Sequence, residues 1–258
     1  MKQGSEKAKK YLLMYTECDK SDMKTKKLFE SEFAKYGDLA HYVEQKSGSI
    51  EDNLNEIVSM ANQVLKGLII LHDKGYSHND IKPNNLLIVE RVCKKASDSL
   101  EKSALRDIGQ QSSLSESEES GKNQHKTAMK IGDFGAKTSI CNTHVKDIFV
   151  NKHFSPPDVY NLSPSAVKGR DIYSLGASLL YFMIGGKKVS YHKVCKELVS
   201  KGAEKFYESY NLGNRYRNKE KTIEFLKIIS EMVKTSYKDR IELKVAQEKI
   251  KAFKSSLK

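Results

Sequence analysis

The sequence has 258 residues, 38% hydrophobic and 30% charged, which suits one large domain or two small ones with a sizeable core. The N-terminus is polar, the longest apolar stretch (residues 175–184) is shorter than the roughly 20 residues of a membrane span, and the four cysteines show neither CxxC pairs nor zinc spacing. We therefore expect an intracellular, cytoplasmic protein without a membrane span, with the nucleus as the alternative location. The formal charge of +12 would suit nucleic acid, but the lysines are spread along the chain without a basic-aromatic motif, so we disfavour a nucleic-acid partner.

The first 50 residues predict a β-hairpin followed by a short helix. Residues 11–15 are a compact apolar run, and residues 28–33 partly alternate between apolar and polar. The polar residues 19–22 between them resemble a turn, which favours an antiparallel pair. Gly37 and Asp38 break this pattern before a short helix that carries Leu39, Tyr42 and Val43.

A long amphipathic helix is predicted from residue 50 to Gly75, because apolar residues recur there at spacings of three and four. Ser49 and Asp52 resemble a capping box at its start, and Gly75 is a suitable stop. The helix leads directly into His78, and short buried strands are predicted at 86–89 and 129–131.

Residues 91–127, between those two strands, are rich in Ser, Glu, Lys and Gln, and we predict a disordered insertion. Its serines beside glutamates suit phosphorylation by an acid-directed kinase, and an equally good interpretation is a solvated loop without a role. The remainder is helical in character, with helices predicted at 171–184, 223–233 and 245–253 and the first of these buried on all sides.

The residues that carry chemistry lie on two loops. Asp80, Lys82 and Asn85 combine a carboxylate, an ammonium group and a carboxamide within six residues, and Asp133 follows the strand at 129–131. Phosphoryl transfer needs a group that accepts the nucleophile's proton, a cation near the phosphate and oxygen ligands for a metal ion. Carboxylate and amide oxygens are ligands that Mg²⁺ prefers, so the two loops together predict a phosphoryl-transfer site.

With these motifs in order, residues 11–255 resemble the hinge and large lobe of a eukaryotic-type protein kinase. The resemblance rests on His-Asn-Asp-Ile-Lys-Pro-Asn-Asn at 78–85, Asp-Phe-Gly at 133–135, a hinge-like segment at 32–39 and the segment Phe-Ser-Pro-Pro-Asp at 154–158. It implies an α+β, protein-kinase-like fold, with a mainly helical large lobe (37–258) and a partial small lobe (1–36) that keeps a β-hairpin and the hinge.

Carried across to this sequence, the resemblance implies one role for each matching residue. Asp80 would be the catalytic base, Lys82 would neutralise the γ-phosphate of ATP, and Asn85 and Asp133 would hold Mg²⁺. Backbone groups of Glu32 and Ala34 would bind the adenine edge, and Leu87 would form the floor beneath it. Lys82 followed by Pro83 resembles the serine/threonine-directed form of the loop, which implies Ser or Thr hydroxyls of a protein substrate as acceptors.

Other matching residues have supporting roles. Asp171 would hydrogen-bond the catalytic-loop backbone, Arg240 would pair with Asp158, and His78 would be a packed scaffold residue. Ser31 falls at the gatekeeper position, which implies an open back pocket.

The sequence departs from the family at position 79, where Asn replaces the usual arginine. Because Asn79 carries no charge to receive a phosphate, we expect an active enzyme not to be switched on by activation-loop phosphorylation. Alanine at Thr138, Ser139 and Thr143 should then leave turnover intact.

The small lobe is the second departure. A complete one needs roughly 55 residues, but only 31 precede Glu32, and they hold a single glycine, Gly4, and no assignable phosphate-binding lysine. Losing such groups typically costs on the order of 100- to 1,000-fold in rate. The open explanations are a truncated sequence, which we favour, a small lobe supplied by another chain, and a degenerate kinase.

Three alternative functions stay open. The first is a pseudokinase-like scaffold that binds partner chains through its large lobe. The second is a small-molecule kinase of the aminoglycoside or choline type, which Lys82 and the Asp-Phe-Gly sequence disfavour, and a basic nucleic-acid binder comes last.

Overall fold

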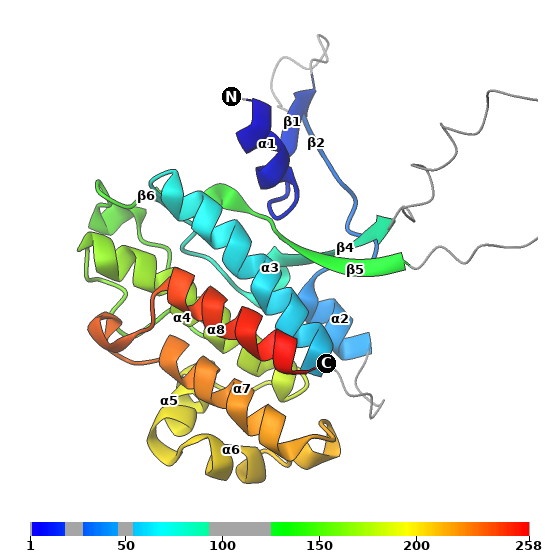
Figure 1. Cartoon of the computed structure of the whole chain (residues 1–258). Helices are drawn as coiled ribbons and strands as arrows, with labels where there is room; N and C mark the ends of the chain where they lie inside the picture. The colour runs from blue at the N-terminus through cyan, green and yellow to red at the C-terminus, as the bar shows by residue number, and fades with distance from the viewer. Residues whose placement is uncertain (1, 19–27, 46–53, 93–124, 258) are drawn as a thin grey trace, which may run out of the picture.

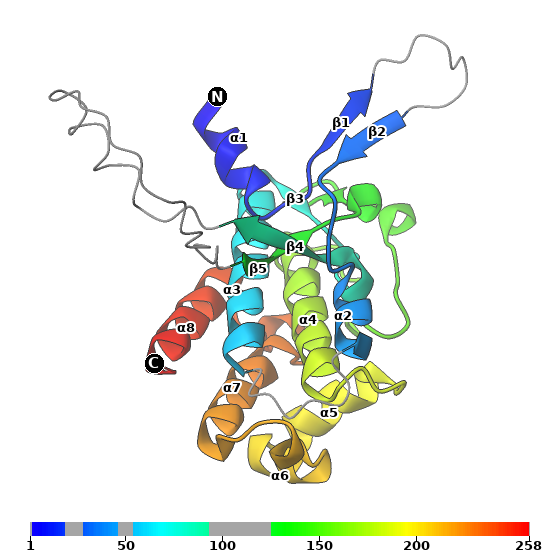
Figure 2. The same ribbon diagram turned by 90° about the vertical axis from the view of Figure 1, so that its right-hand side faces the viewer.

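The computed structural model describes residues 2–18, 28–45, 54–92 and 125–257. Helix α1 (Lys2–Lys9) and a two-stranded hairpin lie above a second two-stranded sheet, and most of the helices lie below that sheet (Figures 1 and 2). The predicted turn at 19–22, the capping box of Ser49 and Asp52, and most of the predicted insertion at 91–127 lie outside the described residues.

The predicted hairpin is present, but its first strand begins later than the sequence indicated. Strand β1 (Tyr15–Cys18) pairs antiparallel with β2 (Leu28–Ser31), with Tyr15 opposite Ser31. Of the run 11–15 that we assigned to the first strand, only Tyr15 belongs to β1; residues 11–13 lie instead beside the second sheet, where the Leu13 amide donates to the Ile131 carbonyl (2.8 Å) and the Ile131 amide donates to the Tyr11 carbonyl (3.0 Å). Tyr11, Leu12 and Leu13 are buried there, which explains why this run is apolar.

The second sheet consists of β4 (Leu86–Val92) and β5 (His125–Ile131), antiparallel, with Leu86 opposite Ile131. Both edges of this sheet are covered at the end where Leu86 and Ile131 lie. Residues 11–13 run along β5, and on the other edge the Tyr36 amide donates to the Ile88 carbonyl (3.2 Å) and the Ile88 amide donates to the Gly37 carbonyl (2.9 Å). The boundary that we placed between residues 36 and 37 stays a prediction.

Helix α3 (Leu54–Asp73) matches the predicted long amphipathic helix and packs beneath β5. It ends before Gly75, whose φ of +82° is a conformation that side chains other than glycine rarely adopt. By length and composition alone, α3 is the one described helix that could cross a membrane, but about half of its apolar window is already buried inside the fold, as in core helices of globular proteins.

Helix α4 (Pro164–Met183) lies at the centre of the helical part and is buried nearly all round, as predicted, although it begins seven residues before the predicted start. Ser163 caps it by accepting a hydrogen bond from the Ala166 amide (3.3 Å), and Pro164 fits the first helical position because its missing N–H has no partner there anyway. Gly176 allows the close approach of the next layer, since a Cβ there would lie 2.6 Å from Val233 Cγ1.

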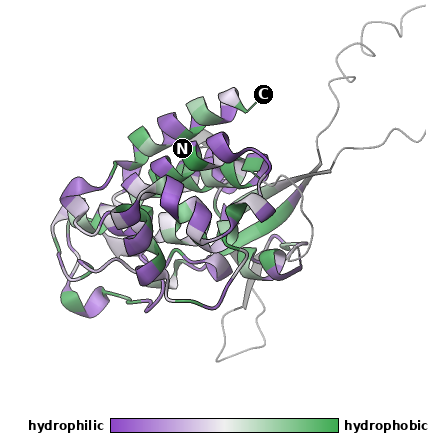
Figure 3. Cartoon of the chain, turned by 90° about the horizontal axis from the view of Figure 1, so that it is seen from below, coloured by the Kyte–Doolittle hydropathy of each residue, from purple (hydrophilic) through white to green (hydrophobic). Residues whose placement is uncertain are grey.

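The remaining helices pack against α3 and α4 or against one another. They are α2 (Leu39–Gln45), α5 (Tyr191–Lys201), α6 (Ala203–Ser209), α7 (Lys219–Met232) and α8 (Leu243–Ser256). The predictions for α2, α7 and α8 are confirmed, and α1, α5 and α6 were not predicted individually. Seen from below, hydrophilic and hydrophobic segments alternate along the outer helices, as expected when each helix buries one face (Figure 3).

Candidate functional site

The catalytic loop predicted at 78–85 connects α3 to β4. After Gly75 the chain forms β3 (Tyr76–Ser77), which pairs antiparallel with β6 (Thr138–Ser139). The loop then closes with the short 3₁₀ helix η1 (Pro83–Asn85), in which Pro83 supplies a fixed φ at the first position. This geometry places the loop between α3 on one side and the chain that follows β5 on the other.

A buried carboxylate, that of Asp171 on α4, holds the start of the loop. It accepts the backbone amides of His78 and Asn79 (2.8 Å each), the Ser77 hydroxyl (2.9 Å) and His72 Nε2 (2.8 Å), and it is fully buried. Burial alone would raise the pKa of this carboxyl, but the hydrogen bond and charge of His72, with the charge and backbone N–H of His78, hold the pKa below its ordinary value. The predicted support of the loop by Asp171 is confirmed.

The three site residues that the sequence predicted on this loop meet at Asp80. Its Oδ2 atom accepts Lys82 Nζ (2.6 Å) and Asn85 Nδ2 (2.9 Å), and Asn85 Nδ2 also donates to the Asp80 carbonyl (2.7 Å). The Asp80 Oδ1 atom is buried and has no hydrogen-bond partner within the part of the chain that the structure describes. A buried carboxylate oxygen without a partner is costly, and such an atom calls for an explanation.

The segment that carries Asp133 lies against the same loop. The Gly132 amide donates to the Asn85 carbonyl (2.9 Å), and His78 Nε2 donates to the Gly132 carbonyl (3.0 Å). The rings of His78 and Phe134 pack edge to face with centroids 5.2 Å apart. Since His78 Nδ1 also accepts the Asp80 amide (3.3 Å), both ring nitrogens are occupied, and the interpretation of His78 as a scaffold residue is confirmed.

Asp133 itself is exposed and adopts a left-handed backbone conformation, with φ of 55°. Its Oδ1 accepts the Gly135 amide (3.3 Å). Asn79 on the neighbouring loop is also left-handed, with φ of 62°. Left-handed residues other than glycine cost free energy and concentrate at functional sites, so two of them on adjacent loops support this location for the site.

The predicted nucleotide-binding residues lie near the same sheet. The Glu32 carboxylate forms an ion pair with Lys130 on β5, and the Ala34 carbonyl accepts the Gly37 amide (2.9 Å). Leu87 is half-buried on β4, and its Cδ1 would lie 2.8 Å from a Cβ built on Gly132, which precedes Asp133. The adenine contacts of these residues and the open pocket at Ser31 stay predictions.

The chain between 137 and 158 contacts the catalytic loop, since Lys82 Nζ lies over the Phe149 ring, 5.6 Å from its centroid. The predicted pairing of its end is confirmed, since Arg240 Nη2 lies 2.5 Å from Asp158 Oδ1. Thr138 and Thr143 are buried and hydrogen-bonded to each other (3.4 Å). An alanine at either position would therefore remove a structural contact, so Ser139 is the cleaner position for testing the expectation about phosphorylation.

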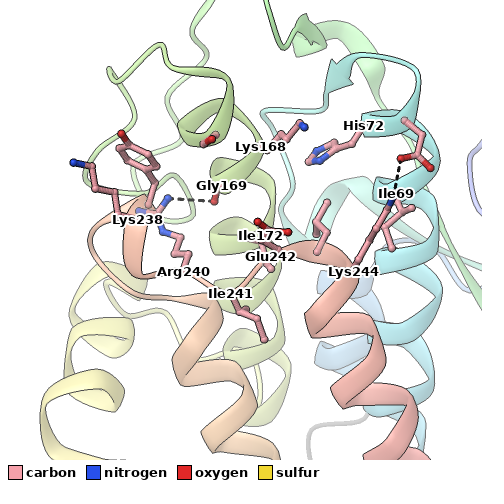
Figure 4. A pocket seen from close by; sticks show the side chains of 14 residues that line it. Ile69, His72, Lys168, Gly169, Ile172, Lys238, Arg240, Ile241, Glu242 and Lys244 are labelled. Carbon is pink, nitrogen blue, oxygen red and sulfur yellow. Dashed lines mark hydrogen bonds and ion pairs between the residues drawn. The ribbon is translucent and has the colours of Figure 1, made fainter.

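A cavity of about 530 Å³ lies behind the loop, between the end of α3, the start of α4 and residues 237–244 (Figure 4). His72 forms part of its wall, and the Lys244 ammonium group lies 3.4 Å from the Asp73 carboxylate across it. Arg240 Nη1 donates to the Gly169 carbonyl on another side (3.2 Å). This cavity does not contain the predicted catalytic residues.

Sequence reasoning missed two residues that contact the loop, His72 and Arg170. His72 follows Leu65 and Leu68 at spacings of seven and four on the apolar face of α3, and this position was the available signal that it points inward. Arg170 had no such signal beyond its place directly before Asp171.

Comparison with known proteins adds an independent observation. The sequence model of the family described as "Protein kinase domain" matches residues 9–250. The chain is 25% identical over 238 residues to the interferon-induced, double-stranded RNA-activated protein kinase of Rattus norvegicus. The aligned region covers 87% of this chain and 39% of that protein.

Two further relatives match shorter parts of the chain. Wee1-like protein kinase 2-A of Xenopus laevis is 29% identical over 156 residues (59% of this chain, 24% of that protein), and serine/threonine-protein kinase PKZ1 of Phytophthora infestans is 29% identical over 130 residues (49% and 27%). The chain thus spans well under half the length of each of these relatives.

Proposed function

This chain belongs to the protein kinase domain family, with the mainly helical α+β fold of that family and a reduced small lobe, and from that premise we propose that it transfers the γ-phosphate of ATP to Ser or Thr hydroxyls of protein substrates. The observation that carries the proposal is the hydrogen-bonded cluster of Asp80, Lys82 and Asn85, in which one buried carboxylate oxygen of Asp80 has no partner among the described residues.

Asp80 is the proposed catalytic base. Lys82 and Asn85 both bind Oδ2, which fixes the carboxylate plane and leaves Oδ1 to accept the proton of an incoming hydroxyl. A base held by two hydrogen bonds loses little orientation when the substrate arrives, and this preorganisation is where such residues gain their effect. Lys82 lies close enough to the carboxylate (2.6 Å) to stabilise negative charge in the same place.

Asn85 and Asp133 are the proposed ligands of Mg²⁺. Because Nδ2 of Asn85 donates to Asp80, its carbonyl oxygen is directed away from the carboxylate and is the atom left to face a cation. With the exposed carboxylate of Asp133 on the adjacent segment, the donor set is one amide and one carboxylate oxygen, which fits a hard divalent ion that completes its shell with water and phosphate oxygens. Bound Mg²⁺ would neutralise charge on the phosphates of ATP.

The nucleotide would lie between this site and residues 32–38. Backbone groups of Glu32 and Ala34 are the proposed adenine contacts, and Leu87 the proposed floor. Two facts support this position: residues 36 and 37 are hydrogen-bonded to β4, and Leu87 on that strand lies next to Gly132, one residue before Asp133.

The preference for Ser or Thr rests on two observations. Lys82 and Pro83 have the form of the loop that resembles serine/threonine-directed enzymes. One relative carries "serine/threonine-protein kinase" in its name. A peptide panel with Ser, Thr and Tyr acceptors in one sequence background tests this preference directly.

A binding module with little activity is the second candidate. Only Gly4 among the residues before Glu32 is a glycine, so the sequence printed here shows no glycine-rich loop over the phosphates. This candidate predicts interaction with partner chains through the helical part, with no phosphoryl transfer.

The deciding experiment measures ATP binding and phosphoryl transfer separately. A thermal-stability shift by ATP that requires Mg²⁺, followed by transfer of labelled γ-phosphate to Ser or Thr peptides, would support the enzyme. Asp80→Asn should abolish phosphoryl transfer and keep the thermal shift that ATP causes. In Asp133→Asn, the thermal shift caused by ATP should no longer depend on Mg²⁺. Asp239→Asn, an exposed aspartate away from the loop, is the matched control. Transfer that is unaffected by Asp80→Asn would refute the proposal.

A further inference from the structure

Arg170 is a buried cation that the proposed chemistry does not use. It lies on α4 directly before Asp171, and its side chain is almost completely buried, with 2% exposure of the residue. Its Nη1 atom donates to Asn79 Oδ1 (3.4 Å) and its Nη2 atom to the Asn161 carbonyl (2.9 Å), while Nε is buried without a partner among the described residues. A buried charge is costly unless its contacts offset the loss of water, so its partner is informative.

No carboxylate in the described part of the chain forms an ion pair with Arg170. The two acidic groups whose charges act on Arg170 are engaged elsewhere: Asp171 accepts the amides of the catalytic loop, and Asp158 accepts Arg240. Burial lowers the pKa of Arg170, and the charges of Asp171 and Asp158 only partly oppose this. The side-chain partner of the guanidinium is therefore the neutral amide of Asn79.

Asn79 connects Arg170 to the chain that follows Asp133. Its Oδ1 atom accepts from Arg170 and lies 3.2 Å from the Ser77 oxygen, whose single proton is donated to Asp171, so its Nδ2 atom must point the other way. Nδ2 donates to Thr138 Oγ1 (2.5 Å) and to the Ala136 carbonyl (3.4 Å). The amide thus links α4, the catalytic loop and the segment at 136–138.

The backbone at Asn79 also needs support. Its φ of 62° lies in the left-handed region, and the next residue in the chain is Asp80. Asparagine tolerates this conformation better than most residues, but it still costs free energy unless the surroundings hold it. The bond from Arg170 on one side and the bond to Thr138 on the other fix the side chain, and with it the turn that aims Asp80.

We propose that Arg170 is a positioning residue: it supplies from α4 the positive charge that position 79 lacks, and through Asn79 it holds both the turn before Asp80 and the segment after Asp133 without a phosphate on that segment. The inference deepens the proposed function, on which its kinetic test rests. Arg170 does not touch the reacting atoms, so its effect reaches them through Asn79.

The kinetic test compares Arg170→Met, which keeps an unbranched apolar stem and removes the guanidinium charge, with Asn79→Ala and the double variant. A hydrogen bond to a charged group contributes enough to change a rate by about 10- to 100-fold. We expect each single variant to lower kcat by about that factor, with KM for ATP within about 2-fold. The double variant should be no slower than the slower single variant, because both remove one contact. Arg170→Lys should recover part of kcat.

Arg215→Met is the matched control. Arg215 also has a buried Nε without a partner, but it lies against Gly185, away from the catalytic loop. Arg215→Met should lower thermal stability and leave kcat unchanged. Equal loss of kcat in Arg215→Met and Arg170→Met, or additive losses in the double variant, would overturn the proposal.

Independence from phosphate is tested with Arg170 and Asn79 left unchanged. Phosphatase treatment, or the substitution Ser139→Ala on the half-buried serine of β6, should change turnover by less than about 2-fold if hydrogen bonds alone hold the segment. A loss greater than about 10-fold would show that a phosphate orders the segment, and the proposal would be wrong.

Hydrogen exchange separates this proposal from the proposed function. The Lys137 amide donates to the Phe134 carbonyl (3.1 Å) and the Ile140 amide to the Gly75 carbonyl (2.9 Å), so both report the order of the segment. If the wild-type chain has no kinase activity, the proposed function fails, but exchange at these two amides should still be faster in Arg170→Met and unchanged in Arg215→Met. Unchanged exchange in Arg170→Met would refute the positioning role whether or not the chain is active.

Discussion

Replacing Asp171 by asparagine is the sharpest test of how the catalytic loop is held. The carboxylate accepts four hydrogen bonds, from His72, Ser77, His78 and Asn79. An asparagine has one acceptor oxygen and one NH₂ group. If its oxygen keeps the position of Oδ2, which serves three donors, its NH₂ group faces the Asn79 amide, and two donors oppose each other in a fully buried site.

The magnitude follows from that geometry. A hydrogen bond to a charged group contributes about 1.5–3 kcal/mol, and a buried donor left without an acceptor costs about 1–3 kcal/mol. Part of this cost is recovered because the neutral amide needs less hydration than the carboxylate did. We expect Asp171→Asn to lower the free energy of unfolding by about 3 kcal/mol, since one bond is lost and the other three are weakened.

Urea denaturation at neutral pH, followed by circular dichroism, measures this change. The matched control is Asp239→Asn, an exposed aspartate that should stay within about 0.5 kcal/mol of the wild type. A loss below about 1 kcal/mol for Asp171→Asn would refute the view that this carboxylate holds the loop.

Three further predictions concern the same part of the fold. The pKa of Asp171 lies below its ordinary value in the folded state. Its contribution to stability is therefore complete well above the unfolded pKa of about 3.9 and is lost as the pH falls through the lowered pKa. Between pH 6 and 3, the free energy of unfolding measured in urea should thus change less with pH in Asp171→Asn than in the wild type. Arg240→Met should lower the free energy of unfolding by about 3–5 kcal/mol, because it removes the ion pair with Asp158 (2.5 Å) together with the donor to the carbonyls of Gly169, Lys234 and Thr235, and a loss below about 1 kcal/mol in urea would contradict this. Gly176→Ala should cost about 1–3 kcal/mol, because the new Cβ would lie 2.6 Å from Val233 Cγ1; combination with Val233→Ala should cost less than the sum of the two single changes, and strict additivity in thermal melts would count against the clash.

Local patterns were sufficient to predict most of the large helical part. The spacing of apolar residues located α3, α7 and α8, and the order of residue types from His78 to Asn85 predicted a cluster that the structure brings together. These predictions succeeded because helical periodicity and a loop of eight residues are properties of adjacent sequence. The roles of the clustered residues in catalysis stay proposals.

Contacts between distant residues were beyond such patterns. The bond from His72 to Asp171 spans 99 positions, and the bond from Arg170 to Asn79 spans 91. The first strand was misplaced for a related reason, since the apolar run at 11–15 has strand character, but burial against β5 competes with pairing in the hairpin for the same residues. Periodicity reports that a residue is buried and does not report what it is buried against.

The covered edges of the β4–β5 pair have a consequence for solubility. An isolated pair of strands is marginally stable in water, and an open edge is a template for pairing with another chain. At the Leu86 end, Leu13 occupies one edge and Gly37 the other, so a second molecule finds no free row of amides there to extend. Removing either flank would uncover apolar residues of β4 and β5 such as Leu86, Ile88 and Ile131, and the chain should then self-associate before it loses its helices.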